Sequence, residues 1–363
     1  MYPPRVCHAL REQGHNVHAI AFTNSRVLKG FRDDGVPTLE FDSSMKALLG
    51  ARSILAYIRE HDIKILHANK SGDMRLAALL VQLAPELRLF FTDHMGVTKP
   101  KKDWYHRWAY SKVTYLFAIS KATFTRNLNA FPVASDRVVQ LYYGMDFNAY
   151  QIPLSETERR VVRVSMGVPE DGVLIALPGR LSPGKGHEVW VKALAELLHQ
   201  QTSEPWHGVV IGDASGADAE PGGYKDRIEQ LVHELGLQQK ITFAGFRGDM
   251  PRCLLACDIS AIPSDNEAFG LSVIESMAAG CAVVGADSGA VPELVGQSRG
   301  MLAPTKEPFA WAVCLERLVN QPELRQRFAS ESRQWALENF TMERHLNALV
   351  AYYRQALSTE VCR

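Results

Sequence analysis

The sequence predicts an α/β protein built from two doubly wound parallel sheets. Short apolar runs recur along the whole chain, and longer amphipathic helical patterns separate them. This alternation of strand and helix favours parallel sheets whose two faces are both covered by helices. The chain has 363 residues, which exceeds one typical domain and suits about two.

The expected elements follow one another in a regular order. The strands are the apolar runs at 17–22, 64–68, 88–92, 114–120, 173–179, 208–212, 240–245, 258–263 and 281–287. Helical patterns occupy 45–60, 72–84, 186–200, 224–236 and 306–320, and a nearly continuous helix broken near Phe340 fills 322–358. Because helices separate the strands, consecutive strands are expected to run parallel.

The alternation weakens between about 147 and 170, where the chain is polar and carries prolines at both ends. We therefore expect a first domain at 1–155 and a second at 156–335. The final segment, 336–363, is expected to be a helix that crosses back to the first domain. Two such domains facing each other form a cleft, and open α/β sheets bind ligands beyond the carboxyl ends of their strands.

Composition and charge exclude several classes of protein. The net charge is zero, so bulk electrostatics give no reason to expect binding to nucleic acid. No apolar run approaches the roughly 20 residues of a membrane span, and no signal peptide is visible. The six cysteines are scattered without zinc-site spacing and suit a reduced, cytoplasmic chain.

A glycine-rich basic turn follows the strand at 173–179. Its glycines let the backbone turn tightly, and Arg180 and Lys185 bring two positive charges to the start of a helix. Free N–H groups and the helix dipole add to this charge, and together they suit a diphosphate. The turn is not a P-loop, because the full pattern G-x-x-x-x-G-K-[ST] is absent: Gly186 and then His187 follow Lys185, where the pattern requires Ser or Thr. A solvated connecting loop remains the alternative.

Two glutamates follow the strand at 258–263. Glu267 stands in a polar turn, and Phe269, Gly270 and Leu271 then begin a helix whose N–H groups can bind hydroxyls or anions. Glu275 lies one turn deeper among apolar residues, where a carboxylate needs partners, and two ribose hydroxyls would satisfy it. The alternatives are a helix cap for Glu267 and an ordinary surface position for Glu275.

A pair of carboxylates could also serve a glycosidase. Such an enzyme places its two acids on opposite sides of one glycosidic bond. Both glutamates here belong to one turn and its helix, beside a basic loop that a glycosidase does not require. The pattern therefore fits a glycosidase poorly.

Together these motifs resemble the retaining glycosyltransferases of family 4, which have the GT-B fold of two Rossmann-like domains. The resemblance covers most of the chain from about residue 5 onward and is strongest in the second domain. The matching segments are GRLSPGKGH (179–187), AGF (244–246), EAFGLSVIESMAAGCAVV (267–284), SGAVPELV (288–295) and, more loosely, FTDHMG (91–96), AISKAT (118–123) and YYGMDFNAY (142–150).

The resemblance implies a role for each matching residue of the second domain. Arg180 and Lys185 would bind the donor diphosphate and stabilise the leaving group, so that neither a metal ion nor another cofactor is expected. Glu275 would hold the nucleotide ribose. Glu267, with the backbone of Phe269, Gly270 and Leu271, would hold the donor sugar.

Further positions complete the implied donor site. His94, from the first domain, would contact the sugar near its reacting carbon. The loop at Gly245 and Phe246 would border the base, and Gly212 and Asp213 would line the same edge. The implied reaction moves a sugar from a nucleoside diphosphate to an acceptor hydroxyl with retention of the anomeric configuration. No residue identifies itself as a protein nucleophile.

The resemblance also implies that one strand is missing. Family members have a strand and a glycine-rich turn before the first helix, whereas RVCHALREQGH (5–15) already reads as that helix. The neighbouring strands would then keep unpaired backbone groups beside a hole in the core. A shortened or non-catalytic relative that binds a nucleotide sugar without efficient turnover is therefore an alternative, and an epimerase or phosphorylase of similar fold is a more remote one.

A basic and aromatic segment at 98–112 belongs to the first domain, which receives the acceptor in this family. Its composition suits an anionic, lipid-linked acceptor or a membrane interface. The general resemblance favours lipopolysaccharide or other cell-surface glycan synthesis at the inner face of the cytoplasmic membrane. The alternative is a solvated helix with its aromatic side chains facing the core.

Overall fold

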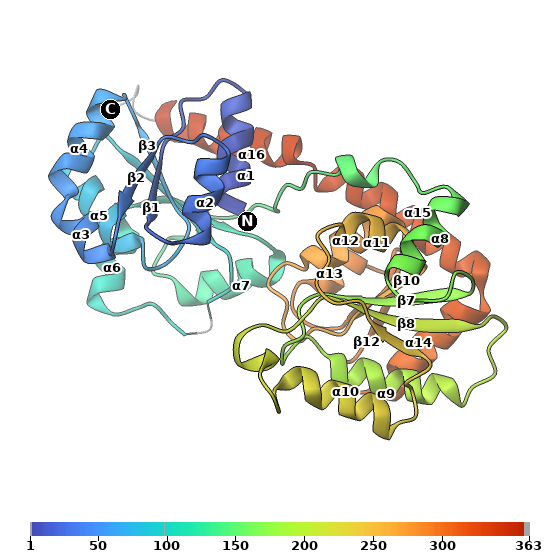
Figure 1. The fold of residues 1–363 in the computed structure, drawn as a ribbon. Coiled ribbons are helices and arrows are strands. Elements are labelled where there is room, and N and C mark those ends of the chain that lie inside the picture. The colour runs from blue at the N-terminus through green and yellow to red at the C-terminus, as the bar shows by residue number, and fades with distance from the viewer. Residues whose placement is uncertain (1, 98, 359–363) are drawn as a thin grey trace. The chain divides into compact units, whose positions relative to one another are not determined.

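The computed structural model describes residues 2–97 and 99–358, which form two compact units. Unit 1 combines the N-terminal part of the chain up to Met145 with the part from Phe340 onward, and unit 2 spans Asp146–Asn339 (Figure 1). All strand pairs within both units are parallel in the described residues. The predicted α/β class with two Rossmann-like units is confirmed.

Unit 2 contains a six-stranded sheet in the order β12-β11-β10-β7-β8-β9. This order is that of a doubly wound nucleotide-binding fold. In such a fold the strand order reverses between the first and the fourth strand, because later strands are added on the other side of the first one. That reversal falls between β7 and β10. The strands are β7 (Val173–Pro178), β8 (Trp206–Ile211), β9 (Ile241–Phe243), β10 (Ile259–Ile262), β11 (Ala282–Ala286) and β12 (Gly300–Ala303).

Helices cover both faces of this sheet (Figure 1). Packing between α9 and α14 buries Trp190 and Trp311 completely, so these two indoles anchor the core on one face. The helices of unit 2 are α8 (Glu156–Ser165), α9 (His187–Leu198), α10 (Tyr224–Glu234), α11 (Met250–Leu255), α12 (Leu271–Ala279), α13 (Val291–Val295), α14 (Pro308–Asn320) and α15 (Pro322–Asn339).

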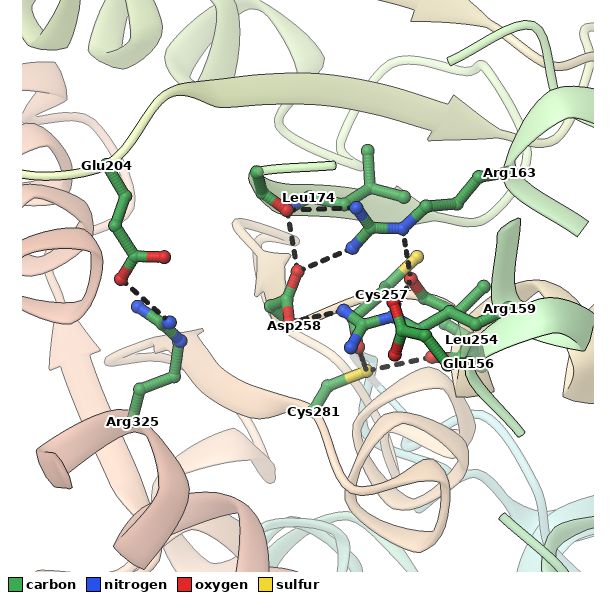
Figure 2. Close-up of polar contacts among 12 residues, drawn as sticks. Glu156, Arg159, Arg163, Leu174, Glu204, Leu254, Cys257, Asp258, Cys281 and Arg325 are labelled. Atoms are coloured by element: carbon green, nitrogen blue, oxygen red, sulfur yellow. Dashed lines mark hydrogen bonds and ion pairs between the residues drawn. The ribbon is translucent and has the colours of Figure 1, made fainter. Parts of the chain in front are cut away.

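Helix α8 occupies the segment where the sequence pattern weakens. Ser155 and Glu158 form a capping box at its start. Its arginines reach the sheet: Arg159 Nη2 donates to Asp258 Oδ1 at 2.5 Å and Arg163 Nη2 donates to Asp258 Oδ2 at 2.8 Å (Figure 2). Because this helix is polar along most of its length and is held in part by charged groups, it does not stand out as an apolar helical pattern in the sequence.

Unit 1 contains two separate sheets. One has the order β1-β2 and the other the order β3-β4-β5-β6. The expected gap in the first domain is thus present between β1 and β3 in the described residues. The strands are β1 (Ala19–Phe22), β2 (Thr38–Phe41), β3 (Ile65–Ala68), β4 (Arg88–Asp93), β5 (Val113–Ala118) and β6 (Val138–Gln140).

The C-terminal helix α16 (Met342–Ser358) packs within unit 1, where it contacts α1. The long helical pattern at 322–358 breaks between α15 and α16 at Phe340, as predicted. The other helices of unit 1 are α1 (Tyr2–Glu12), α2 (Arg26–Asp33), α3 (Ser44–Leu49), α4 (Ala51–Glu60), α5 (Met74–Leu83), α6 (Trp104–Ser111) and α7 (Lys121–Ala130).

The single helix predicted at 45–60 is wrong, because Gly50 divides it into α3 and α4. Gly50 adopts ψ 5° and ends the first helix, and a Cβ at this position would lie 3.0 Å from the Phe41 ring. Glycine is a poor helix former, and here the close ring leaves no room for a larger residue.

Candidate functional site

The loop between β7 and α9 carries the predicted basic turn. Gly184 and Gly186 have φ of 85° and 80°, which favours glycine, and Gly186 is the N-cap of α9. A Cβ at Gly186 would lie 2.3 Å from the carbonyl oxygen of Pro263, so the loop packs directly against the end of β10. The backbone N–H of Asp265 also donates to the Gly184 carbonyl at 2.9 Å. Two strand ends therefore meet at the switch point of the sheet.

Lys185 and Glu267 form an ion pair across these two loops, in which Nζ donates to Oε1. The Lys185 side chain is 34% exposed and that of Glu267 is 19% exposed, so ligand can reach a pair that water screens only partly. Arg180 is exposed at the start of the same basic loop. The structure thus brings together one cation and one carboxylate that the sequence predicted on separate motifs.

The ends of β8 and β9 adjoin the same loop. A Cβ at Gly212 would lie 1.9 Å from the carbonyl oxygen of Gly179, and Gly212 also forms an isolated β-bridge with Gly245. The following residue, Phe246, is 82% exposed, so its ring is free to stack on a planar ligand. These residues line one continuous edge of the sheet.

Asp213 lies at this edge beside Lys225. Lys225 Nζ donates to Asp213 Oδ1 at 3.0 Å, and this hydrogen bond lowers the pKa of the Asp213 carboxyl. Asp213 is therefore an ionised carboxylate with a partner of its own. It is better placed to shape the loop than to accept a proton.

The N-terminus of α12 forms the third part of the site. Gly270 is its N-cap with φ 92°, and no side chain caps the helix there. Phe269 is buried, whereas Leu271 is 45% exposed. Glu275 is half-buried one turn further along, between side chains that are fully buried in the core. Its carboxylate is therefore held at the edge of the core and not on an open helix surface.

Residues that sequence reasoning passed over hold Glu267 in place. A Cβ at Gly289 would lie 2.3 Å from the Glu267 carbonyl oxygen, and the Ala290 N–H donates to that oxygen at 2.9 Å. Ser288 Oγ accepts from the Asn266 N–H at 3.0 Å and donates to Asp265 at 3.1 Å. The matching segment SGAVPELV (288–295) contains this loop, but the sequence did not indicate that these residues position Glu267.

His94 belongs to unit 1, where it follows β4. Its Nε2 lies 2.9 Å from Asn69 Oδ1, and its Nδ1 contacts the Tyr143 hydroxyl. Because an amide oxygen only accepts, Nε2 carries the proton and Nδ1 accepts from Tyr143. Burial lowers the pKa of His94 to about 4, so the ring is neutral at pH 7. Asn69 and Tyr143 fix its orientation. Tyr143 belongs to the loosely matching segment 142–150, but no role was expected for it, and no motif pointed to Asn69.

The aromatic side chains of the segment 98–112 divide between core and solvent, and residue 98 itself lies outside the described residues. Tyr110 is buried and Trp108 packs against the core of unit 1, whereas Trp104 is 82% exposed. Lys102 and Arg107 are exposed near Trp104 in the sequence. Within the described residues, no helix combines the length and the apolar character needed to cross a membrane.

Two family models match the chain. The model "Glycosyl transferases group 1" covers 158–335, and the model "Glycosyltransferase Family 4" covers 5–149. The two matches lie one after the other along the chain, and the match at 158–335 contains the basic loop and both glutamates.

A curated relative from Jonesia denitrificans, named D-inositol 3-phosphate glycosyltransferase, is 32% identical over 216 residues, which are 58% of this chain and 50% of the relative. A relative of the same name from Corynebacterium glutamicum is 31% identical over 228 residues, which are 62% of this chain and 53% of the relative. The chain therefore spans about half the length of these curated relatives.

Solved structures show the same fold at low identity. A glycosyltransferase from Rickettsia africae has a TM-score of 0.84 and 21% identity, with 97% of this chain and 93% of that chain covered. HepE from Anabaena in complex with UDP has a TM-score of 0.83 and 22% identity, with 98% and 96% covered. The chain accordingly has the GT-B fold, and its two parts are similar to family 4 and to group 1 glycosyltransferases.

Proposed function

We propose that this protein is a retaining, metal-independent glycosyltransferase that moves a sugar from a nucleoside diphosphate to an acceptor hydroxyl. The observation that carries the proposal is the meeting of Lys185 and Glu267 at the switch point of the unit 2 sheet. There, a cation that suits a diphosphate lies beside a carboxylate that suits sugar hydroxyls. A nucleotide sugar carries both groups next to each other.

Donor binding exchanges the partners of this ion pair. The diphosphate takes Lys185 as its counter-ion, together with Arg180 and the N–H groups at the start of α9. Glu267 is thereby released to accept hydrogen bonds from hydroxyls of the donor sugar. Glu275, one turn into α12, accepts from the ribose hydroxyls, and Phe246 and the backbone at Gly245 border the base.

The chemical step develops negative charge on the departing diphosphate. Arg180, Lys185 and the positive end of α9 stabilise that charge in place, and such preorganised groups lower a barrier without reorganising. They make a metal ion unnecessary for leaving-group stabilisation. Turnover is therefore expected to persist in excess EDTA and to gain nothing from added Mg²⁺ or Mn²⁺; a strict requirement for either ion would refute this part.

His94 is proposed to contact the donor sugar near its reacting carbon. Its ring is neutral and oriented by Asn69 and Tyr143, so it positions the sugar or donates a hydrogen bond from Nε2 and does not carry positive charge. To bond a sugar through Nε2, the ring must give up its bond to Asn69 Oδ1. A backbone contact from the same loop needs no such exchange.

The donor and acceptor are proposed from weaker signals. Structural neighbours in complex with UDP make uridine diphosphate sugars the first donors to test. The exposed Trp104 with Lys102 and Arg107 suits an anionic, lipid-linked glycan acceptor at the inner face of the cytoplasmic membrane, in lipopolysaccharide or other cell-surface glycan synthesis. The relatives' name makes phosphorylated inositol a second acceptor class to include.

Turnover tests the proposal directly. The protein is incubated with a UDP-sugar and a mixture of lipid-linked and inositol phosphate acceptors, and the anomeric configuration of the product is read by NMR. An α-linked product from an α-linked donor supports the proposal, whereas inversion refutes retention. Liposomes containing anionic lipid should bind the protein at low salt, and failure to bind removes the membrane part.

A second candidate function is a binding protein that holds a nucleotide sugar without efficient turnover. The separation of the β1-β2 sheet from the β3-β4-β5-β6 sheet favours it, since a divided unit 1 is a poor platform for an acceptor. Tight nucleotide-sugar binding with no transfer to any acceptor would select this alternative.

A further inference from the structure

The loop at 244–249 leaves the sheet of unit 2 at its edge. It follows β9, which is the last strand in the order of this sheet and, within the described residues, pairs with β8 alone. On the side of β8, the bridge between Gly245 and Gly212 ties the loop to the sheet. Packing does little to hold the rest, because a Cβ at Gly245 or Gly248 would meet no atom within 4 Å beyond its own chain neighbours, and the Phe246 ring is 82% exposed.

Arg247 holds the other side of this loop. Its Nη1 donates to the carbonyl oxygen of Ser165 at 3.0 Å, and its Nη2 donates to Ser165 Oγ at 3.1 Å. Nε and Nη2 also donate to the two carboxylate oxygens of Asp249, each at 2.9 Å. One planar guanidinium can serve all these partners, because its N–H groups point outward in a fixed fork.

Both partners of Arg247 belong to the ends of helices. Ser165 is the last residue of α8, where the final carbonyl groups of a helix attract a cation, and Asp249 immediately precedes α11. Helices α8 and α11 contact each other (Figure 1). The hydrogen bond from Arg247 lowers the pKa of the Asp249 carboxyl, so its carboxylate is ionised at neutral pH. Arg247 thus fastens the loop, next to Phe246, to two packed helices.

A direct contact between Arg247 and a nucleotide is the alternative. The four hydrogen bonds engage all three nitrogens of the guanidinium, and the side chain is only 20% exposed. The neighbouring Phe246 is the exposed group. This geometry favours an arrangement in which Arg247 shapes the loop and Phe246 meets the ligand.

We propose that Arg247 is a positioning residue that holds Gly245 and Phe246 in the conformation that receives the nucleotide base, and that it acts without touching the donor. This inference rests on the proposed function, which places the base at this loop. Without the guanidinium fork, the loop samples other conformations, and the apparent affinity falls in proportion to the population of the receptive one. A receptive population of about one in ten corresponds to about tenfold weaker binding.

Isothermal titration calorimetry with two ligands tests the proposal. The first ligand is whichever of UDP, GDP and ADP binds the wild type most tightly, and the second is inorganic pyrophosphate, which lacks the base and the ribose. Arg247→Gln should bind the nucleotide about tenfold more weakly and should bind pyrophosphate as the wild type does. Arg247→Lys should lose nearly as much nucleotide affinity, because a single ammonium cannot serve Ser165 and both carboxylate oxygens of Asp249 together.

Thr242→Val is the matched control. The Thr242 hydroxyl donates to the Gly167 carbonyl at 3.3 Å, which is a second contact between β9 and the segment that follows α8. Its loss should lower the melting temperature slightly and should change the affinity for neither ligand. A loss of nucleotide affinity in this control as large as in Arg247→Gln would reduce the effect to general loosening of the edge and overturn the proposal.

A double-mutant cycle shows whether Arg247 acts through Phe246. Phe246→Ala should weaken nucleotide binding, and adding Arg247→Gln to it should weaken binding no further. Additive losses, or an equal loss of pyrophosphate affinity, would overturn the proposal. A wild type that binds the nucleotide no more tightly than pyrophosphate would contradict the base site of the proposed function, whereas a preference that Arg247→Gln retains would overturn this inference alone.

Discussion

Glu275 lies in α12 next to side chains that are buried in the core. A half-buried carboxylate between core side chains has lost part of its hydration, and a ligand that returns hydrogen bonds to it gains more than it would from an exposed carboxylate. The ribose of a nucleotide offers two adjacent hydroxyls for this purpose. The role of Glu275 can therefore be tested with the ligand as well as with the protein.

Glu275→Ala is expected to weaken UDP binding about 10–100-fold, the range for hydrogen bonds to a charged group. The same variant should bind UDP and 2′-deoxy-UDP with similar affinity, whereas the wild type should prefer UDP. Isothermal titration calorimetry with both nucleotides measures this, and Glu196→Ala on the exposed side of α9 is the control. A variant that still discriminates between the two nucleotides would assign the ribose to another residue.

Residue identities were predictable where a motif joined charge to glycine, as at Lys185 and Glu267. The partners that orient these groups were not. Asn69 and Tyr143 stand far from His94 in the sequence, and only folding places their side chains on its ring. Gly289 and Ala290 contact the Glu267 backbone, and Ser288 Oγ bonds the neighbouring Asp265 and Asn266, contacts that a sequence pattern does not reveal.

At the scale of elements, the contact between the β7–α9 loop and the end of β10 sets the geometry of the site. Gly186 and Gly184 have nearly the same positive φ, so substitution by alanine imposes similar backbone strain of about 1–2 kcal/mol at each. Only at Gly186 would the new Cβ meet a backbone atom, the Pro263 carbonyl oxygen at 2.3 Å.

Gly186→Ala should therefore lower the free energy of unfolding more than Gly184→Ala does, because the two loops must move apart. It should also weaken nucleotide binding more. Urea unfolding and calorimetry on both variants measure the difference. Equal losses would mean that the close approach of the loops contributes nothing beyond backbone strain.

The ion cluster under α8 gives a second element-scale prediction (Figure 2). Asp258 accepts from Arg159, from Arg163 and from the Leu174 N–H at 2.8 Å, and the Arg163 side chain is only 3% exposed. Asp258→Asn leaves that guanidinium buried without its counter-ion and should cost roughly 3–5 kcal/mol of unfolding free energy.

The Arg325–Glu204 pair in the same view is the control. Glu204 is 37% exposed, so Glu204→Gln should cost about 1 kcal/mol or less. Urea denaturation of both variants makes the comparison. Similar losses would show that α8 is held by its apolar contacts and not by its charges.

The same two elements show what limited prediction at this scale. The strands of unit 2 are mostly continuous apolar runs. The sequence predicted every strand of unit 2 except β12. Helix α8 is held by ion pairs to Asp258, the residue before β10, which an apolar pattern does not detect. Helices α3 and α4 separate at Gly50, where the backbone leaves the helical conformation.

At the scale of the whole molecule, buried neutral histidines link stability to pH. Burial lowers the pKa of His67 to about 3 and the pKa values of His94, His187 and His345 to about 4. In the unfolded chain these imidazoles have a pKa of about 6.5. Below that value the unfolded chain binds more protons, so the stability contributed by the neutral rings is lost as the pH falls toward 4.

The melting temperature is therefore expected to be several degrees lower at pH 5.5 than at pH 7, at constant ionic strength. Burial raises the pKa of Asp73 and Asp93, which acts in the opposite sense but at lower pH. His345→Gln should reduce the pH dependence, whereas His199→Gln at an exposed site should not. A melting temperature that is the same at both pH values would contradict the linkage.

The alternation of strand and helix predicted the overall fold class. Both faces of a parallel sheet must be covered by helices, and the alternating apolar runs and amphipathic patterns indicate this arrangement. The divided sheet of unit 1 followed from a comparison of its first helix with the family and is visible as the gap between β1 and β3. The sequence predicted that a basic loop and two carboxylates lie at the switch point of the unit 2 sheet. It did not predict that Lys185 and Glu267 form an ion pair there.

The measurement that tests the central claim most directly is a thermal-shift titration with UDP, GDP, ADP and CMP on the wild type, Lys185→Ala and, as control, Lys192→Ala on an exposed position of α9. We predict that one diphosphate raises the melting temperature of the wild type and of Lys192→Ala, and that Lys185→Ala loses this response. Equal stabilisation of all three proteins, or no stabilisation by any nucleotide, would contradict a donor site at this edge of the sheet.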